Sequence, residues 1–133
     1  MILRFLSAFY GGMKSVSSGF YYNWGMTYAR WGQPLKALFY LNRAAKLNDK
    51  GAHIFYQRAL LLIAMGQPQS AIYDFDAAIK ANPEHMEAYL NRGMMYALTG
   101  KIEKAEEDVE KAVALGADRP SLESQIAELR DQV

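Results

Sequence analysis

Residues 32–34 read Gly-Gln-Pro, the same triplet returns at residues 66–68, and a glycine stands again at Gly100, so that three copies follow one another at a constant interval. Two alanines recur with each glycine, five and twelve residues after it. A fixed period of about 34 residues indicates three copies of one helical hairpin, which stacks on its neighbours to bury its apolar face. Stacked hairpins usually build a binding surface and not a reaction centre.

The apolar residues follow the 3.6-residue helical period, and Gly, Pro and Asn mark the breaks between helices. Pro34, Pro68 and Pro83 are expected at helix starts, where a missing N–H costs nothing. The repeated glycines are expected in the turns between paired helices, where a positive φ permits a tight reversal. The predicted helices are 19–31 and 34–47, 53–65 and 68–81, 84–99 and 102–115, and a final helix over 120–132.

Residues at fixed positions in each unit resemble the tetratricopeptide repeat, a helix-turn-helix family with the same period. Small residues at these positions let helices approach one another, and aromatic residues fill the gaps between them. Arg58, Ala59 and Arg92 depart from the pattern, as residues of such degenerate repeats often do. The residues at the remaining positions are Tyr21, Trp24, Gly25, Tyr28, Ala37 and Leu41 in the first unit, Phe55, Leu62, Ala71, Phe75 and Pro83 in the second, and Tyr89, Gly93, Tyr96, Ala105 and Val109 in the third.

The resemblance implies an all-α fold, a right-handed α-solenoid of three helix-turn-helix units with an extra N-terminal helix and a C-terminal capping helix. The apolar face of the last helix consists of Leu122, Ile126 and Leu129 at helical intervals, and its polar face is expected to meet water. The expected segments are 1–17 for the N-terminal helix, 18–51, 52–85 and 86–117 for the three units, and 118–133 for the cap.

The composition is that of an ordinary globular domain, with 133 residues, 51% of them hydrophobic and 22% charged. The absence of cysteine excludes disulfides and thiolate metal sites. The net charge of +1 hides an asymmetry, because no acidic residue precedes Asp49 whereas residues 101–133 hold nine acids and five bases. We expect a positive and a negative end. These charges either form solvated helix faces or attract an acidic partner or an anionic membrane to the basic end.

In this family the first helices of successive units line a concave groove, so the resemblance implies which side chains face it. A central apolar row of Met26, Leu60 and Met94 suits an amphipathic helix or an extended apolar segment. The alternative is that several of these residues are core, buried against the second helices. The complete expected groove consists of Tyr22, Asn23, Met26, Arg30, His53, Tyr56, Gln57, Leu60, Glu87, Leu90, Asn91, Met94 and Leu98.

Family members that bind chaperone tails hold the terminal carboxylate of an acidic peptide with lysines, asparagines and an arginine. The corresponding positions here hold Tyr22, Met26, Gln57, Glu87 and Asn91, and only Asn91 matches. Without the lysines the charge-assisted hydrogen bonds of such a clamp are lost, and Glu87 would repel an acidic tail. The sequence therefore argues against this class of partner.

The segment 1–17 lies outside the repeats and predicts a short one-sided helix, which Gly11 and Gly12 loosen. It is too short to span a bilayer. Because so short a helix is marginal in water, its apolar face needs a cover, which a second chain, the molecule's own groove, a membrane surface or the first repeat could supply. The residues expected to make self-association or membrane contacts are Ile2, Phe5, Leu6, Phe9, Tyr10 and Met13.

The sequence contains few residues or motifs that indicate catalysis. His53 and His85 do not pair on one helix, His85 is expected to be exposed in a loop, and no phosphate-binding loop or nucleophile motif occurs, so we expect no metal, cofactor or catalytic residue. Scattered basic residues argue against nucleic acid. We expect a cytoplasmic, non-enzymatic scaffold, adaptor or chaperone-like module whose partner is a protein or peptide with an apolar or amphipathic segment. The alternative is a self-associating structural protein whose N-terminal helix joins chains into a homo-oligomer or attaches to a membrane surface.

Overall fold

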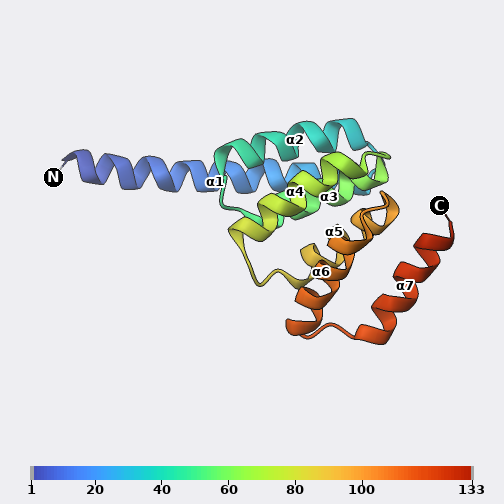
Figure 1. Cartoon of the computed structure of the whole chain (residues 1–133). Helices are drawn as coiled ribbons and strands as arrows, with labels where there is room; N and C mark the ends of the chain where they lie inside the picture. The colour runs from blue at the N-terminus through green and yellow to red at the C-terminus, as the bar shows by residue number, and fades with distance from the viewer. Residues whose placement is uncertain (1, 133) are drawn as a thin grey trace.

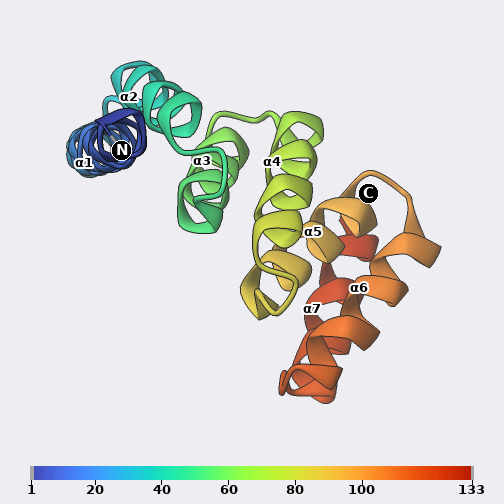
Figure 2. The same cartoon turned by 90° about the vertical axis from the view of Figure 1, so that its left-hand side faces the viewer.

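The computed structural model describes residues 2–132, except for the side chains of residues 9 and 12–16, and every regular element in this range is an α-helix. The helices pack as antiparallel pairs, α1 with α2, α3 with α4 and α5 with α6, and α7 follows the third pair (Figure 1). Figure 2 shows the pairs stacked one after another along a curved path. The predicted all-α solenoid is therefore confirmed. The helices are α1 (Ile2–Arg30), α2 (Pro34–Leu47), α3 (Ala52–Ala64), α4 (Pro68–Ala81), α5 (Met86–Leu98), α6 (Ile102–Ala114) and α7 (Arg119–Asp131).

The repeated glycines close the hairpins as predicted. Gly32, Gly66 and Gly100 have φ angles of 68°, 75° and 81°, in the left-handed region that glycine enters without steric cost. The residue after each glycine donates its N–H to a carbonyl of the preceding helix; the bond from Gln33 to Tyr28 is 2.9 Å long. This geometry ends one helix and turns the chain directly into the next.

Two of the three expected proline positions are confirmed, and one is wrong. Pro34 and Pro68 are the first residues of α2 and α4. Pro83 instead lies in the turn before α5, which begins only at Met86, and its carbonyl accepts a hydrogen bond of 3.1 Å from the Tyr89 hydroxyl. The helix begins later because His85 caps it, its Nδ1 accepting the Ala88 N–H at 3.3 Å.

The N-terminal segment is not a separate helix loosened at Gly11, as the sequence suggested, but the first half of α1. Figure 1 shows this half projecting well beyond the hairpins, so it does not fold back into the groove. A helix held at residues 18–30 by packing on α2 needs no new nucleus to extend, and a glycine costs it only about 1 kcal/mol. The side chains of Phe9 and Met13, two of the predicted contact residues, lie outside the described part of the chain.

The core consists of small residues at the helix crossings and large residues between them. Ala37, Ala71 and Ala105, which occupy equivalent positions, are fully buried. At Gly25 an added Cβ would lie 2.9 Å from Leu41 Cγ and 3.3 Å from the Ala37 carbonyl oxygen, so α1 and α2 approach closely there. The close approach expected from the sequence is present at this crossing.

The last helix, α7, covers the end of the third unit. Its Leu122 is buried in a cluster with Tyr89 and Val109, and Ile126 packs against the same cluster. Asp118 caps the helix by accepting the N–H of Ser121 at 3.1 Å. The apolar face of α7 thus shields residues that a further repeat would otherwise cover.

Candidate functional site: a groove along the first helices

The thirteen residues expected in the groove lie on α1, α3 and α5, the first helices of the three pairs. None of them is buried. The central row of Met26, Leu60 and Met94 is half-buried, and both Leu60 and Met94 pack partly on the core cluster around Phe75. These side chains therefore belong in part to the core and in part to the accessible surface. Four of the thirteen are exposed, namely Asn23, Arg30, His53 and Glu87, and the other nine are half-buried.

Side chains of neighbouring helices touch along this surface. The ring of Tyr22 on α1 lies edge-on to that of His53 on α3, with centroids 4.9 Å apart. On the next step, Asn91 Nδ2 on α5 donates to the Tyr56 hydroxyl of α3 at 3.2 Å. These contacts run from the first unit to the second and from the second to the third, so the residues expected in the groove form a continuous surface.

The electrostatics of the groove disfavour negative charge. Burial raises the pKa of the Tyr22 hydroxyl, and burial together with the Glu87 carboxylate raises the pKa of Tyr56, whereas the Asn91 hydrogen bond acts in the opposite direction. Both phenols are neutral at physiological pH. The centre of the groove is consequently apolar with neutral hydroxyl and amide groups, and Glu87 adds a negative charge at its side.

Sequence reasoning missed the part that α7 plays at the end of the groove. A cavity of about 380 Å³ lies between α5 and α7, lined by Leu90, Asn91 and Met94 on one side and by Leu122 and Gln125 on the other. The polar residues of α7 were expected simply to meet water, but Gln125 and Ser121 border this cavity. No sequence signal distinguished them, because only the packing angle of α7 brings them beside α5.

His85 was expected to be a solvated loop residue, and this is wrong. Its side chain is only 16% exposed, caps α5, and lies with its ring 4.8 Å from that of Tyr56. The imidazole thus packs against the ring of Tyr56 on α3. Within residues 2–132, no group of three or more His, Cys, Asp or Glu side chains is arranged to hold a metal ion.

A pair of partly buried Arg–Asp ion clusters, also unforeseen, joins the two helices within a unit. Arg58 on α3 binds Asp74 on α4 with two hydrogen bonds of 2.7 Å, and Arg92 repeats the arrangement with Asp108 one unit later. Burial raises the pKa of Asp108, while its hydrogen bonds to Arg92 oppose that rise and hold the pKa of Arg92 above its ordinary value. The recurrence of both partners, one unit apart, was the signal that could have revealed them.

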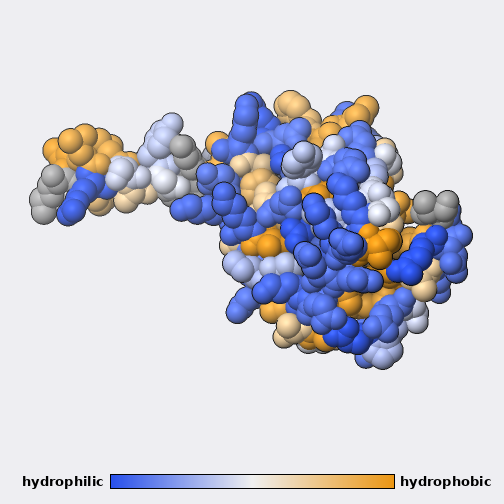
Figure 3. Space-filling view, viewed as in Figure 1, coloured by the Kyte–Doolittle hydropathy of each residue, from blue (hydrophilic) through white to orange (hydrophobic). Residues whose placement is uncertain are grey.

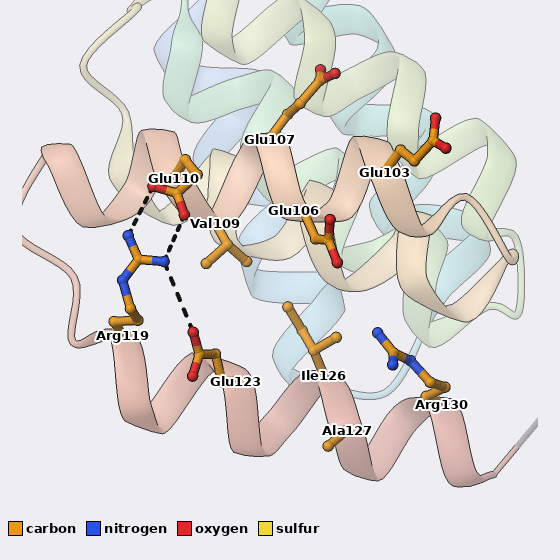
Figure 4. Close-up of a pocket in the computed structure, with 10 residues that line it drawn as sticks. All are labelled: Glu103, Glu106, Glu107, Val109, Glu110, Arg119, Glu123, Ile126, Ala127 and Arg130. Carbon is orange, nitrogen blue, oxygen red and sulfur yellow. Dashed lines mark hydrogen bonds and ion pairs between the residues drawn. The ribbon is translucent and has the colours of Figure 1, made fainter.

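The acidic end expected from the sequence surrounds a second cavity, of about 680 Å³, between α6 and α7 (Figure 4). Val109 and Ile126 approach one another across it, and glutamates stand at its rim. Arg119 on α7 donates to both carboxylate oxygens of Glu110, at 2.6 and 2.8 Å, and lowers the pKa of that carboxyl. This bridge fixes the start of α7 against α6.

Comparisons with known proteins agree with this architecture. Two sequence profiles described as tetratricopeptide repeat match residues 18–50 and 56–120. A search of curated proteins found no significant match. None of the helices described here is long and apolar enough to cross a membrane.

Solved structures supply three-dimensional parallels. YrrB, described as a repeat protein with an unusual peptide-binding site, is 28% identical over 86% of this chain, with a TM-score of 0.71. MamA is 26% identical over 77% of the chain, with the same TM-score. The chain spans a little over half the length of these two proteins, 57% and 55% respectively. The first tetratricopeptide repeat domain of Spaghetti (RPAP3), bound to the HSP90 peptide SRMEEVD, shares the fold with a TM-score of 0.79. It is 18% identical to this chain, and the match covers 89% of this chain and 94% of that domain.

Proposed function

This chain belongs to the tetratricopeptide repeat family, and we propose that it is a non-catalytic interaction module that binds an apolar or amphipathic peptide in the groove along α1, α3 and α5. The observation that carries the proposal is the row of Met26, Leu60 and Met94. These side chains recur one unit apart and stay partly accessible on a surface of stacked helices. Methionines adapt their shape to different apolar ligands, which suits such a surface.

The ligand chemistry follows from what borders this row. Gln57 and Asn91 supply neutral polar groups, and Glu87 supplies a negative charge. A helix with one apolar face and lysines beside it would place methyl groups on the row and positive charges near Glu87. An acidic peptide such as SRMEEVD, which the Spaghetti domain binds, would meet Glu87 without the compensating lysines of a carboxylate clamp.

The cavity beside α7 sets one end of the proposed binding surface. Leu90 and Met94 form its apolar part, and Gln125 offers an amide that can bond to a peptide backbone. We expect a bound helix to end here, since α7 stands across the path along α5. The groove then accommodates a short segment and not a long one.

Fluorescence anisotropy with labelled amphipathic peptides tests this function. A helical peptide with leucines on one face and lysines beside them should bind, and its acidic counterpart with glutamates in place of the lysines should bind more weakly. Leu60→Asp should weaken binding of the basic peptide at least tenfold, because it buries a carboxylate against the ligand's apolar face. Equal peptide affinity of Leu60→Asp and the unsubstituted protein would contradict the groove proposal.

Leu35→Asp provides the matched control. Leu35 is an exposed leucine on α2, outside the groove, so the same substitution there should leave peptide affinity unchanged. Because Leu60 also touches the core, circular dichroism and melting temperature should be measured for both variants, and peptide binding should be compared well below the lower melting temperature.

A further inference from the structure

The side of α1 that faces away from the repeats is apolar and uncovered. The positions equivalent to Phe20 in the second and third units hold Ile54 and Ala88, which are 1% and 0% exposed because the preceding unit covers them. Phe20 itself is 56% exposed. Trp24, at 39%, extends the same face along the helix, and Trp31, at 62%, follows in the turn directly after the helix ends at Arg30.

This face continues into the projecting half of α1. Ile2 and Leu6, 77% and 55% exposed, precede Phe20 along the helix. From Ile2 to Phe20 the sequence places an apolar residue every three or four positions, at Leu6, Phe9, Met13 and Val16. Figure 3 shows hydrophobic atoms gathered at the tip of the projecting helix. We call Ile2, Leu6, Phe20, Trp24 and Trp31 the α1 stripe; at 1.5 Å per residue it runs for about 43 Å.

The repeats lie behind the stripe and leave it accessible. Ser18 and Gly25 mark the side of α1 that meets α2: the Ser18 hydroxyl donates to the Ala44 carbonyl at 3.0 Å, and Gly25 abuts Leu41. At about 100° per residue, Phe20 lies roughly half a turn from these two positions, whereas Trp24 lies about a third of a turn from them, with its ring centroid 6.5 Å from that of Tyr40 on α2. A partner helix can therefore cover Ile2, Leu6 and Phe20 clear of α2, and reaches the edge of α2 beside Trp24.

We propose that the α1 stripe pairs with the α1 stripe of a second copy of this chain, antiparallel and related by a two-fold axis. The inference is independent of the peptide groove, which lies on another face of α1. In this arrangement the projecting half of each α1 covers the anchored half of its partner, as a preceding unit covers α3 and α5 in the repeats themselves. The contact is closed and self-complementary, so it yields a dimer and not a filament.

The available area suits a stable dimer. At roughly 200 Å² for a large side chain, the exposed fractions of the stripe, together with those of Leu3 and Phe5 beside it, amount to about 900 Å² on each chain. Stable interfaces take about 800 Å² from each partner. The stripe alone would supply about 600 Å², so its neighbours in the projecting half must also contribute.

The sizes of the side chains favour the antiparallel direction. The tryptophans lie in the anchored half of α1 and the aliphatic residues of the stripe in the projecting half. Antiparallel pairing sets Ile2 near the Trp31 position and Leu6 near the Thr27 position of the second copy, with the axis between residues 16 and 17. Parallel pairing would oppose Trp24 to its own copy, and two such bulky residues would hold the helices apart.

Charge also favours a second copy over a lipid surface. Helix α1 contains three basic residues and no acidic one, and in the antiparallel register no two bases oppose each other, because Arg4, Lys14 and Arg30 lie opposite positions 29, 19 and 3 of the second copy. Arg4 lies half a turn from Ile2 and Leu6 in the helical register, and would point away from an anionic membrane that touched the stripe. Arg4 thus contributes little to lipid attachment in this orientation.

Light scattering on the full chain tests the dimer. The protein should elute with twice its 15.0 kDa chain mass, and Leu6→Glu and Phe20→Glu, each of which places a charge in the stripe, should elute as monomers with unchanged helix content. Leu35→Glu, on an exposed leucine of α2, should remain a dimer. A monomeric unsubstituted protein, or a dimer that both stripe variants preserve, would overturn the proposal, as would a monomer that floats with vesicles of phosphatidylcholine and phosphatidylglycerol.

Disulfide cross-linking tests the direction, because the chain has no cysteine of its own. Ser17→Cys should link to itself under mild oxidation. Leu6→Cys should not link to itself, since its two copies lie about 30 Å apart in the antiparallel pair, but should link to Thr27→Cys when the two variants are mixed. Efficient linkage of Leu6→Cys to itself would overturn the antiparallel arrangement.

Discussion

Arg92 on α5 reaches two carboxylates on different helices: it donates two hydrogen bonds, of 2.8 and 2.7 Å, to Asp108 on α6 and a third, of 2.8 Å, to Asp76 on α4. Asp108 belongs to the same unit as Arg92, and Asp76 belongs to the unit before. One guanidinium therefore closes a hairpin and joins it to its neighbour. Because the planar fork matches both carboxylate oxygens of Asp108, lysine cannot reproduce this arrangement.

Arg92→Leu should lower the free energy of unfolding by about 2 kcal/mol, because it leaves the Asp108 carboxylate buried without its partner. Urea denaturation measures the loss. The double variant Arg92→Leu, Asp108→Leu should recover most of it, since two apolar groups replace the pair. A single variant as stable as the unsubstituted protein would show that the cluster does not hold the third unit.

Gly25→Ala should destabilise the protein by about 1–2 kcal/mol, since the crowding of Leu41 and the Ala37 carbonyl outweighs the better helix propensity of alanine. Gly11→Ala is the matched control, because no atom lies within 4 Å of an added Cβ there. It should instead slow amide exchange in the projecting half of α1. A gain in stability from both substitutions would contradict the close crossing of α1 and α2.

Gly66→Ala should cost about 1 kcal/mol although open space surrounds its Cβ position, because alanine resists the φ of 75°. Gly66→Asn should cost less, since asparagine enters the left-handed region more readily. Thermal melting of both variants separates conformational strain from crowding. Equal melting temperatures for all three proteins would argue against a strained turn.

The pKa of Tyr56 should respond to its two neighbours in opposite directions. Glu87→Gln should lower it by removing a negative charge, and Asn91→Ala should raise it by removing a hydrogen bond to the phenolate. NMR of ring-labelled tyrosine follows the titration. Since the folded state has the higher pKa, Tyr56 stabilises the fold below the pKa of an unfolded tyrosine, and this contribution disappears as pH rises through the folded-state pKa.

The regular spacing of the repeats predicted most of the fold, because each glycine turn imposes a local backbone geometry that the flanking sequence also encodes. Pro34 and Pro68 marked helix starts for the same local reason. The helix start predicted at Pro83 was wrong because His85 caps α5 two residues later, and a side-chain cap competes with proline in setting a helix start. The continuous α1 was missed because tertiary anchoring on α2 outweighs the local cost of Gly11.

The site was predicted only in part. A helical offset identifies which residues of α1, α3 and α5 share a face, and the structure leaves all thirteen of them accessible to some degree. The contribution of α7 could not be predicted, because it depends on a packing angle between helices. The Arg–Asp clusters could have been predicted from their repetition, but Arg58 and Arg92 were treated as departures from a pattern and not as a pattern of their own.

NMR of ¹³C-methyl-labelled methionine tests the proposed groove most directly, with the basic amphipathic peptide as the ligand. Met26 and Met94 belong to the proposed groove and lie on different helices, and the neighbouring Met95 is buried in the core and serves as an internal control. We expect saturating peptide to shift the Met26 and Met94 methyl signals and to leave that of Met95 in place. Binding that leaves both groove signals unmoved would contradict the account.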